Sequence, residues 1–279
     1  MPDNRGHSLV SPSGAHSWMR CTKSPRFVES LNLPPEQDEP WAAEGTIAHW
    51  MCEQWLKALP AGPPAFAARM DCPTDDAEPV AVESGGYETA EMMPHVEQYV
   101  DYVRGQLPTD GSRYELGVER EVDLRRWVPG MFGSADSVVL RDWGPDGPQA
   151  MFVNDFKYGT GVTVPINYGS WDDPEPNPQL CLYAFGLMGP SVRTVRISII
   201  QPRVGNLSWM DLTRDQLARA VAPAVKAGNM AYEGMGRFAP SPQTCQFCRG
   251  VAWCRAALRA SGLPALADGP GHDERKEDR

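Results

Sequence analysis

The chain has 279 residues, of which 42% are hydrophobic and 22% charged. This is enough for a packed core and excludes a wholly disordered or fibrous protein. Asp and Glu (36) outnumber Lys and Arg (26), and the net charge of -10 argues against a general nucleic-acid coat while allowing one local basic groove. No window approaches ~18 apolar residues and the opening residues are polar, so we expect a cytosolic protein with no membrane association.

Two helices are expected in the first part of the chain. Residues 41–58 place Ile47, Trp50 and Trp55 at helical spacing on one face, and apolar spacing returns in residues 91–106. The intervening segment 60–88 is rich in Pro, Gly, Asp and Ala without periodicity, which predicts a loop.

From residue 114 the apolar period changes from helical to two, which is typical of β-strands. Three strands, mostly antiparallel, are expected at 114–124, 130–141 and 149–159. The next expected elements are a helix capped by Asn177, a strand and a helix with a kink at Pro223, at 177–188, 192–202 and 212–228.

This order of elements predicts an α/β or α+β fold, with a mixed central sheet flanked by helices. We expect four segments along the chain: an N-terminal segment at 1–40, a core at 41–210, a helix with a cysteine-bearing segment at 211–260, and a disordered charged tail at 261–279.

Candidate catalytic residues gather on two predicted strands. Asp155 and Lys157 are two residues apart, so their side chains point to the same face of a strand, and Asp136 lies on the preceding strand. Carboxylates that hold Mg²⁺ or Mn²⁺ beside a lysine that orients water are what metal-assisted phosphodiester hydrolysis requires. Taken alone, a D-x-K triplet is more often part of a solvated strand face.

Three further residues complete an ordered pattern. His49 lies on the first predicted helix, and Gln179 and Tyr183, four residues apart, share a face of a later helix. Taken alone, His49 is more simply an ordinary helix histidine, and Gln179 with Tyr183 is more simply one helical face that packs on the sheet. Together with the strands they give the order H…GxxD…DxK…QxxxY, in which each residue occupies an element that lets all of them converge.

With these motifs the sequence resembles the RecB-type branch of the PD-(D/E)XK nuclease superfamily, which includes the AddB nuclease domain and the CRISPR-adaptation nucleases. The resemblance covers about residues 8–258, and the segments SPSGAHSWMRC and AAEGTIAH are most similar to an uncharacterised phage and prophage family of that branch. It implies a restriction-endonuclease-like core.

The resemblance also implies roles for individual residues. The metal ligands would be His49, Asp136, Asp155 and the backbone carbonyl of Phe156, with Asp136, Asp155, Lys157, Gln179 and Tyr183 as the catalytic set. Gln179 and Tyr183 would support the site or touch the DNA backbone. Beyond this set, Glu53 is a candidate for supporting His49. Glu119 and Glu121 are candidate extra ligands, although a solvated strand face is the better interpretation.

The seven cysteines argue for reduced thiols rather than a secreted disulfide scaffold. Three of them form C-x₂-C-x₅-C near the C-terminus, and such a group needs a fourth thiolate to hold either zinc or an iron–sulfur cluster. The spacing leaves zinc and iron–sulfur open. The resemblance implies a [4Fe–4S] cluster on four cysteines: Cys21, Cys245, Cys248 and Cys254.

Of the remaining cysteines, Cys52 and Cys181 are expected in the core and Cys72 as a free thiol, with Cys72 in place of Cys21 as the alternative ligand.

The leading expectation is a divalent-metal-dependent DNA nuclease, an exonuclease acting on duplex ends or single strands in phage DNA replication, recombination or processing. A phage recombinase or a single-strand-binding protein is the expected partner. The alternative is a catalytically silent DNA-binding or scaffolding module with the same fold, stabilised by iron–sulfur or zinc. A third interpretation is a zinc-stabilised interaction protein in which the D-x-K motif is accidental.

Overall fold

The computed structural model describes residues 8–34, 40–59, 89–170 and 172–262. The expected loop at 60–88, Cys72 within it and the expected charged tail from residue 263 on lie outside the described residues. No described helix is both long enough and apolar enough to span a membrane.

The chain forms two compact units. The first, here called the sheet unit, comprises Glu36–Val122 and Ser134–Ala218. The second, here called the cysteine unit, comprises Met1–Pro35, Asp123–Gly133 and Arg219–Arg279. The sheet unit thus takes the middle of the chain, and the cysteine unit combines both ends with a short central segment.

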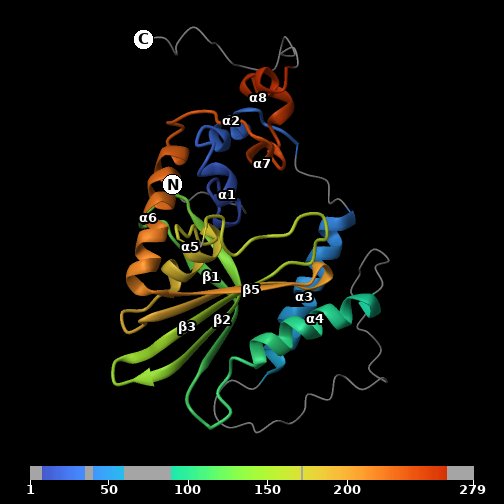
Figure 1. Ribbon diagram of the computed structural model, residues 1–279. Coiled ribbons are helices and arrows are strands. Elements are labelled where there is room, and N and C mark those ends of the chain that lie inside the picture. Colours follow the sequence, from blue (N-terminus) through green and yellow to red (C-terminus); the bar gives the residue numbers. More distant parts are fainter. Residues whose placement is uncertain (1–7, 35–39, 60–88, 171, 263–279) are drawn as a thin grey trace. The chain divides into compact units, whose positions relative to one another are not determined.

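A mixed five-stranded sheet forms the centre of the sheet unit, which confirms the expected α/β architecture (Figure 1). Its strands lie in chain order: β1 (Glu115–Asp123), β2 (Phe132–Gly144), β3 (Gly147–Phe156), β4 (Thr194–Gln201) and β5 (Asn206–Thr213). Strand β3 pairs antiparallel with β2 and parallel with β4, and β4 pairs antiparallel with β5. Strand β5 was not among the expected elements.

Helices pack on both faces of this sheet. Helices α3 (Pro40–Ala58) and α4 (Thr89–Arg104) form an apolar core with alternate residues of the strands, including Val139 and Phe156. Helix α5 (Pro178–Leu187) contacts β3 and β4. Asp155, the neighbour of Phe156 on β3, accepts a hydrogen bond from Gln179 of this helix. Because side chains alternate across a strand, α5 must lie on the face opposite α4. Asn177 caps α5 by accepting the Leu180 N–H, as expected from the sequence.

A buried polar network joins helix α4 and the residues just after it to strands β2 and β3. Asn154 and Gln106 exchange two side-chain hydrogen bonds of 2.8 and 2.9 Å. Asn154 also donates to the Ser137 hydroxyl at 3.2 Å, and the Tyr99 hydroxyl donates to Ser137 at 2.9 Å. Since Asn154 and Ser137 are paired residues of β3 and β2, these bonds stabilise the register of the two strands.

The cysteine unit is built from short helices: η1 (Pro12–Gly14), α1 (Ala15–Trp18), α2 (Ser24–Ser30), α7 (Pro242–Cys245), η3 (Val251–Trp253) and α8 (Arg255–Ala260), with most of α6 (Arg214–Tyr232). Its two terminal segments are hydrogen-bonded to each other: Ser17 Oγ donates to the Thr244 carbonyl at 3.1 Å, and the Arg237 N–H donates to Thr22 Oγ1 at 3.3 Å. Parts of the chain more than two hundred residues apart therefore form one folded body.

Candidate active site

The register of β2 and β3 brings the two expected aspartates together. The register ends at the pair Ser137–Asn154, and the next residues of the two strands are Asp136 and Asp155, which are close enough for the charge of Asp155 to raise the pKa of Asp136. Asp155 is at the end of β3 with its side chain only 4% exposed, and Lys157 follows immediately after the strand, its N–H bonded to the Ile200 carbonyl at 2.9 Å. Two acids and an amine therefore meet where β3 ends.

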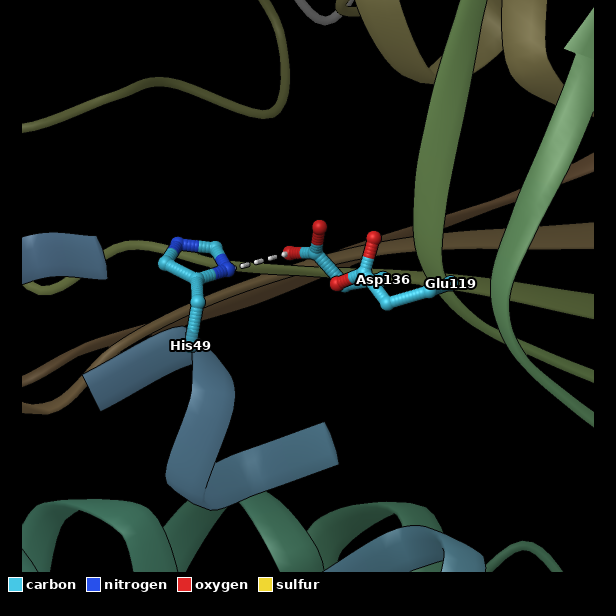
Figure 2. A group of neighbouring side chains, drawn as sticks. All are labelled: His49, Glu119 and Asp136. Atoms are coloured by element: carbon cyan, nitrogen blue, oxygen red, sulfur yellow. Dashed lines mark ion pairs between the residues drawn. The ribbon is translucent and has the colours of Figure 1, made fainter. Parts of the chain in front are cut away.

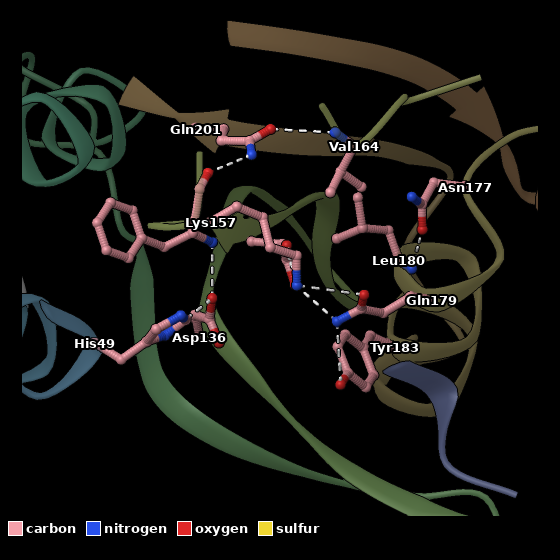
Figure 3. Close-up of polar contacts among 12 residues, drawn as sticks. His49, Asp136, Lys157, Val164, Asn177, Gln179, Leu180, Tyr183 and Gln201 are labelled. Carbon is pink, nitrogen blue, oxygen red and sulfur yellow. Dashed lines mark hydrogen bonds and ion pairs between the residues drawn. The ribbon is translucent and has the colours of Figure 1, made fainter. Parts of the chain in front are cut away.

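Helix α5 adds the glutamine and tyrosine to this group (Figure 3). Gln179 Nε2 donates to Asp155 Oδ1 at 2.8 Å and lies 3.5 Å from the Tyr183 hydroxyl. Lys157 Nζ lies 2.9 Å from Asp155 Oδ2 and 3.5 Å from Gln179 Oε1. The D-x-K and Q-x-x-x-Y pairs thus form one connected set of polar contacts around Asp155.

His49, Glu119 and Asp136 form a group able to hold a metal ion (Figure 2). One ligand atom from each lies within 4.8 Å of the others, and His49 Nδ1 is 3.6 Å from Asp136 Oδ2. The Phe156 N–H donates to Asp136 Oδ2 at 2.7 Å, and the His49 ring packs edge to face on the Phe156 ring at 5.2 Å between centroids. Helix α3 and strands β1 and β2 each supply one member.

Glu119 is the member that sequence reasoning assigned to a solvated strand face. Its carboxylate is exposed but accepts a hydrogen bond from Ser134 Oγ at 2.8 Å and faces His49 and Asp136. Its backbone has a φ of 49°, in the left-handed region that residues other than glycine rarely adopt. This kink interrupts the alternation of β1, so Glu119 and Glu121 need not share a face, and Glu121 is not part of the group.

The electrostatics of the site are those of acids held close together. Burial, and then the neighbouring Asp155, raise the pKa of Asp136 well above its usual value. Burial and then Lys157 lower the pKa of His49, which keeps the imidazole neutral with a lone pair available for a metal. Burial alone lowers the pKa of Lys157, but the charges of Asp155 and Asp136 outweigh it and raise that pKa.

His49, Glu119 and Asp136 fit a divalent cation, and Asp155, whose charge acts on Asp136, is not itself part of that group. Asp155 Oδ2 is buried and makes no hydrogen bond of normal geometry, its neighbour being the Lys157 ammonium group. The His49 side chain interacts with the Phe156 backbone, and this interaction raises the pKa of His49 against the larger effect of burial. The Phe156 backbone therefore also faces the group. Carboxylate and carbonyl oxygens with one imidazole suit Mg²⁺ or Mn²⁺, and a bound cation would relieve the repulsion between Asp136 and Asp155.

Glu53, which we expected to support His49, instead forms an ion pair with Lys57 one turn further along α3. Cys52 and Cys181 are buried, 3% and 1% exposed, as predicted for core residues. Burial raises the pKa of Cys181 to about 12, so it remains a thiol.

A second candidate site lies in the cysteine unit. The four cysteines of the expected cluster are free thiols that line one small pocket together with Phe27, Phe238 and neighbouring residues: Cys21, Cys245, Cys248 and Cys254. Burial raises the pKa of Cys248, and the other three thiols raise it further. Sequence-distant Cys21 therefore shares the pocket with the C-x₂-C-x₅-C motif.

Fold and site together define an α/β protein with a mixed sheet and a histidine–carboxylate–lysine centre at the end of its third strand. The model of the family described as "Protein of unknown function (DUF2800)" matches residues 7–266, and the chain belongs to this family. A solved structure titled "Crystal structure of SSO0001" is similar with a TM-score of 0.32 and 12% sequence identity, covering 85% of this chain and 95% of that chain.

Proposed function

We propose that this protein is a divalent-metal-dependent DNA nuclease of the RecB-type PD-(D/E)XK branch. The observation that carries the proposal is the convergence of Asp136, Asp155 and Lys157 at the end of β3, with His49 beside Asp136 and with the buried Asp155 Oδ2 2.9 Å from the Lys157 ammonium nitrogen. A structural protein has no need to gather one buried and one half-buried acid and a lysine at one point, since the repulsion between the two acids costs stability.

The bound cation, Mg²⁺ or Mn²⁺, would polarise the phosphate and offset the charge that develops on it. His49, Asp136, Asp155 and the Phe156 carbonyl would hold this ion, and Glu119 joins them as a further ligand. Gln179 donates to Asp155 Oδ1 at 2.8 Å, which fixes the orientation of the carboxylate. Lys157, protonated beside two acids, can orient the attacking water and stabilise negative charge on phosphate oxygens.

For the cysteine unit we propose a structural [4Fe–4S] cluster on Cys21, Cys245, Cys248 and Cys254, with zinc as the alternative. The pocket that the four thiols share supports the cluster. Such a clasp closes a loop of more than two hundred residues between Cys21 and Cys245 and stabilises the unit by restricting the unfolded chain.

We propose that this activity serves phage DNA replication, recombination or processing in the bacterial cytosol, as the resemblance implies. Its substrates would be duplex ends or single-stranded DNA, and the expected mode is exonucleolytic. The acidic chain would depend on a phage recombinase or single-strand-binding protein for loading, since its net charge of -10 repels DNA at long range.

The test is degradation of end-labelled linear DNA, single-stranded and duplex, by protein purified without oxygen, in the presence of Mg²⁺, Mn²⁺ or EDTA. Asp155→Asn and Lys157→Ala should each lower the rate at least about a hundredfold. The exposed Asp142→Asn on β2 and Lys226→Ala on α6 are matched controls and should cleave like the unaltered protein. DNA binding without cleavage by folded, cluster-loaded protein would instead favour the non-catalytic module.

A further inference from the structure

The segment that carries the cysteine motif also exposes large apolar side chains. Phe247 is 64% exposed, Trp253 41% and Val251 39%, all within seven residues of the chain. These three residues are here called the aromatic surface. Clusters of large exposed apolar side chains in a folded protein are uncommon and generally mark a binding site.

The exposure of the aromatic surface follows from how its backbone is held. A Cβ atom at Gly250 would lie 2.9 Å from Phe27 and 3.1 Å from Val28, so the backbone there lies directly on α2. Hydrogen bonds from Val251 N–H to the Cys248 carbonyl and from Cys254 N–H to the Val251 carbonyl fix the turns on either side. With the cysteines directed to their pocket, the aromatic residues between them are held in solvent.

The surroundings of the aromatic surface are basic in an otherwise acidic chain. Residues 234–262 contain four arginines and no Asp or Glu. Together with residues 8–34, the terminal segments of the cysteine unit carry seven Lys or Arg residues against one acid, Glu29, which pairs with Arg26. This +6 contrasts with the net charge of -10 for the whole chain, so the positive charge is concentrated in the part that holds the cysteines.

We propose that the aromatic surface binds single-stranded nucleic acid, with unpaired bases stacking on Phe247 and Trp253 and the nearby arginines neutralising phosphates. Aromatic side chains interspersed with basic residues are the features of sequence-tolerant single-strand binding. A protein partner would not require the concentrated positive charge, and a duplex offers no unpaired base to stack. The proposal rests on the proposed function only for the choice of DNA as the strand to be tested.

The test is fluorescence anisotropy of a labelled oligothymidine, with an abasic oligonucleotide of the same length for comparison, in EDTA so that binding is measured without cleavage. Phe247→Ala and Trp253→Ala should each weaken oligothymidine binding roughly 5- to 150-fold, because stacking contributes about that factor per base. Phe247→Tyr and Trp253→Phe keep a ring and should bind nearly normally. Trp209→Ala, 51% exposed on β5 in the sheet unit, is the matched control and should not change binding.

Unchanged melting temperature and iron content in the two alanine variants would show that the unit is intact. The proposal is overturned if both variants bind like the unaltered protein, or if the abasic oligonucleotide binds as well as oligothymidine. Binding lost in both variants while no DNA is cleaved would leave the aromatic surface standing and remove the nuclease. Cleavage that Asp155→Asn abolishes, together with unchanged binding by both alanine variants, would support the nuclease and overturn the aromatic surface as a binding site.

Discussion

The buried network beneath the site makes a quantitative prediction about stability. Asn154 is fully buried and its amide makes three hydrogen bonds, two with Gln106 and one with Ser137. Asn154→Leu keeps the size of the side chain but removes all three. Ser137 retains its bond from Tyr99, whereas the Gln106 amide loses both the partner of its oxygen and the partner of its nitrogen.

The expected cost follows from the groups left without partners. Each buried polar group without a hydrogen bond costs about 1–3 kcal/mol, so Asn154→Leu should lower the free energy of unfolding by about 2–6 kcal/mol. For a chain of this size that corresponds to a fall in melting temperature of roughly 2–4 °C per kcal/mol. The double variant Asn154→Leu with Gln106→Leu removes both sides of the pair and should recover a large part of the loss.

Urea and thermal unfolding of the full chain would measure these differences, with the exposed Gln98→Leu on α4 as the control that should change stability little. A loss below about 0.5 kcal/mol for Asn154→Leu would refute the reasoning, since that is the range of ordinary surface substitutions. If the double variant loses as much free energy of unfolding as the two single variants lose together, the two amides are not energetically paired.

Three further outcomes are expected. Glu119→Gln should weaken Mn²⁺ binding about 10- to 100-fold by titration, while Glu121→Gln should leave it unchanged; equal affinities of both would remove Glu119 from the metal group. Gly250→Ala forces its methyl group against α2 and should cost about 1–3 kcal/mol in thermal unfolding, and a melting temperature equal to that of the unaltered protein would contradict the packing. Cys254→Ser should lose the bound iron seen by visible absorption and metal analysis, whereas Cys181→Ser should keep it; retention in both would exclude the proposed cluster.

Much of the fold followed from local patterns. The Asn177 cap, the Pro178 start of α5 and the strand with Asp155 at its end each depend on residues close together in the chain. The predicted buried face of α3 was wrong at Trp50, which is 37% exposed, whereas Ile47 is buried. Strand alternation alone placed Asp155 and Lys157 on one side, and the helical turn placed Gln179 beside Tyr183. These contacts were predictable because each involves a single element or one hairpin.

Two features could not be predicted from such patterns. The left-handed backbone at Glu119 breaks the alternation from which its orientation was inferred, and nothing in the local sequence signals it. Strand β5 was missed because it is an edge strand whose outer residues are polar or exposed, including Trp209 at 51%, so its apolar period is weak. Its place in the sheet is set by pairing with β4, a contact made through the turn at Gly205, whose φ is 64°.

The central claim is that the group around Asp136 and Asp155 binds a divalent cation. Its most direct measurement is a titration of cation-free protein with Mn²⁺, in which the unbound ion is quantified by its electron paramagnetic resonance signal. The unaltered protein should remove Mn²⁺ from solution at a saturable site, and Asp136→Asn and Asp155→Asn should each abolish that binding while Asp142→Asn keeps it. Saturable binding that survives both substitutions, or none in the unaltered folded protein, would contradict the account.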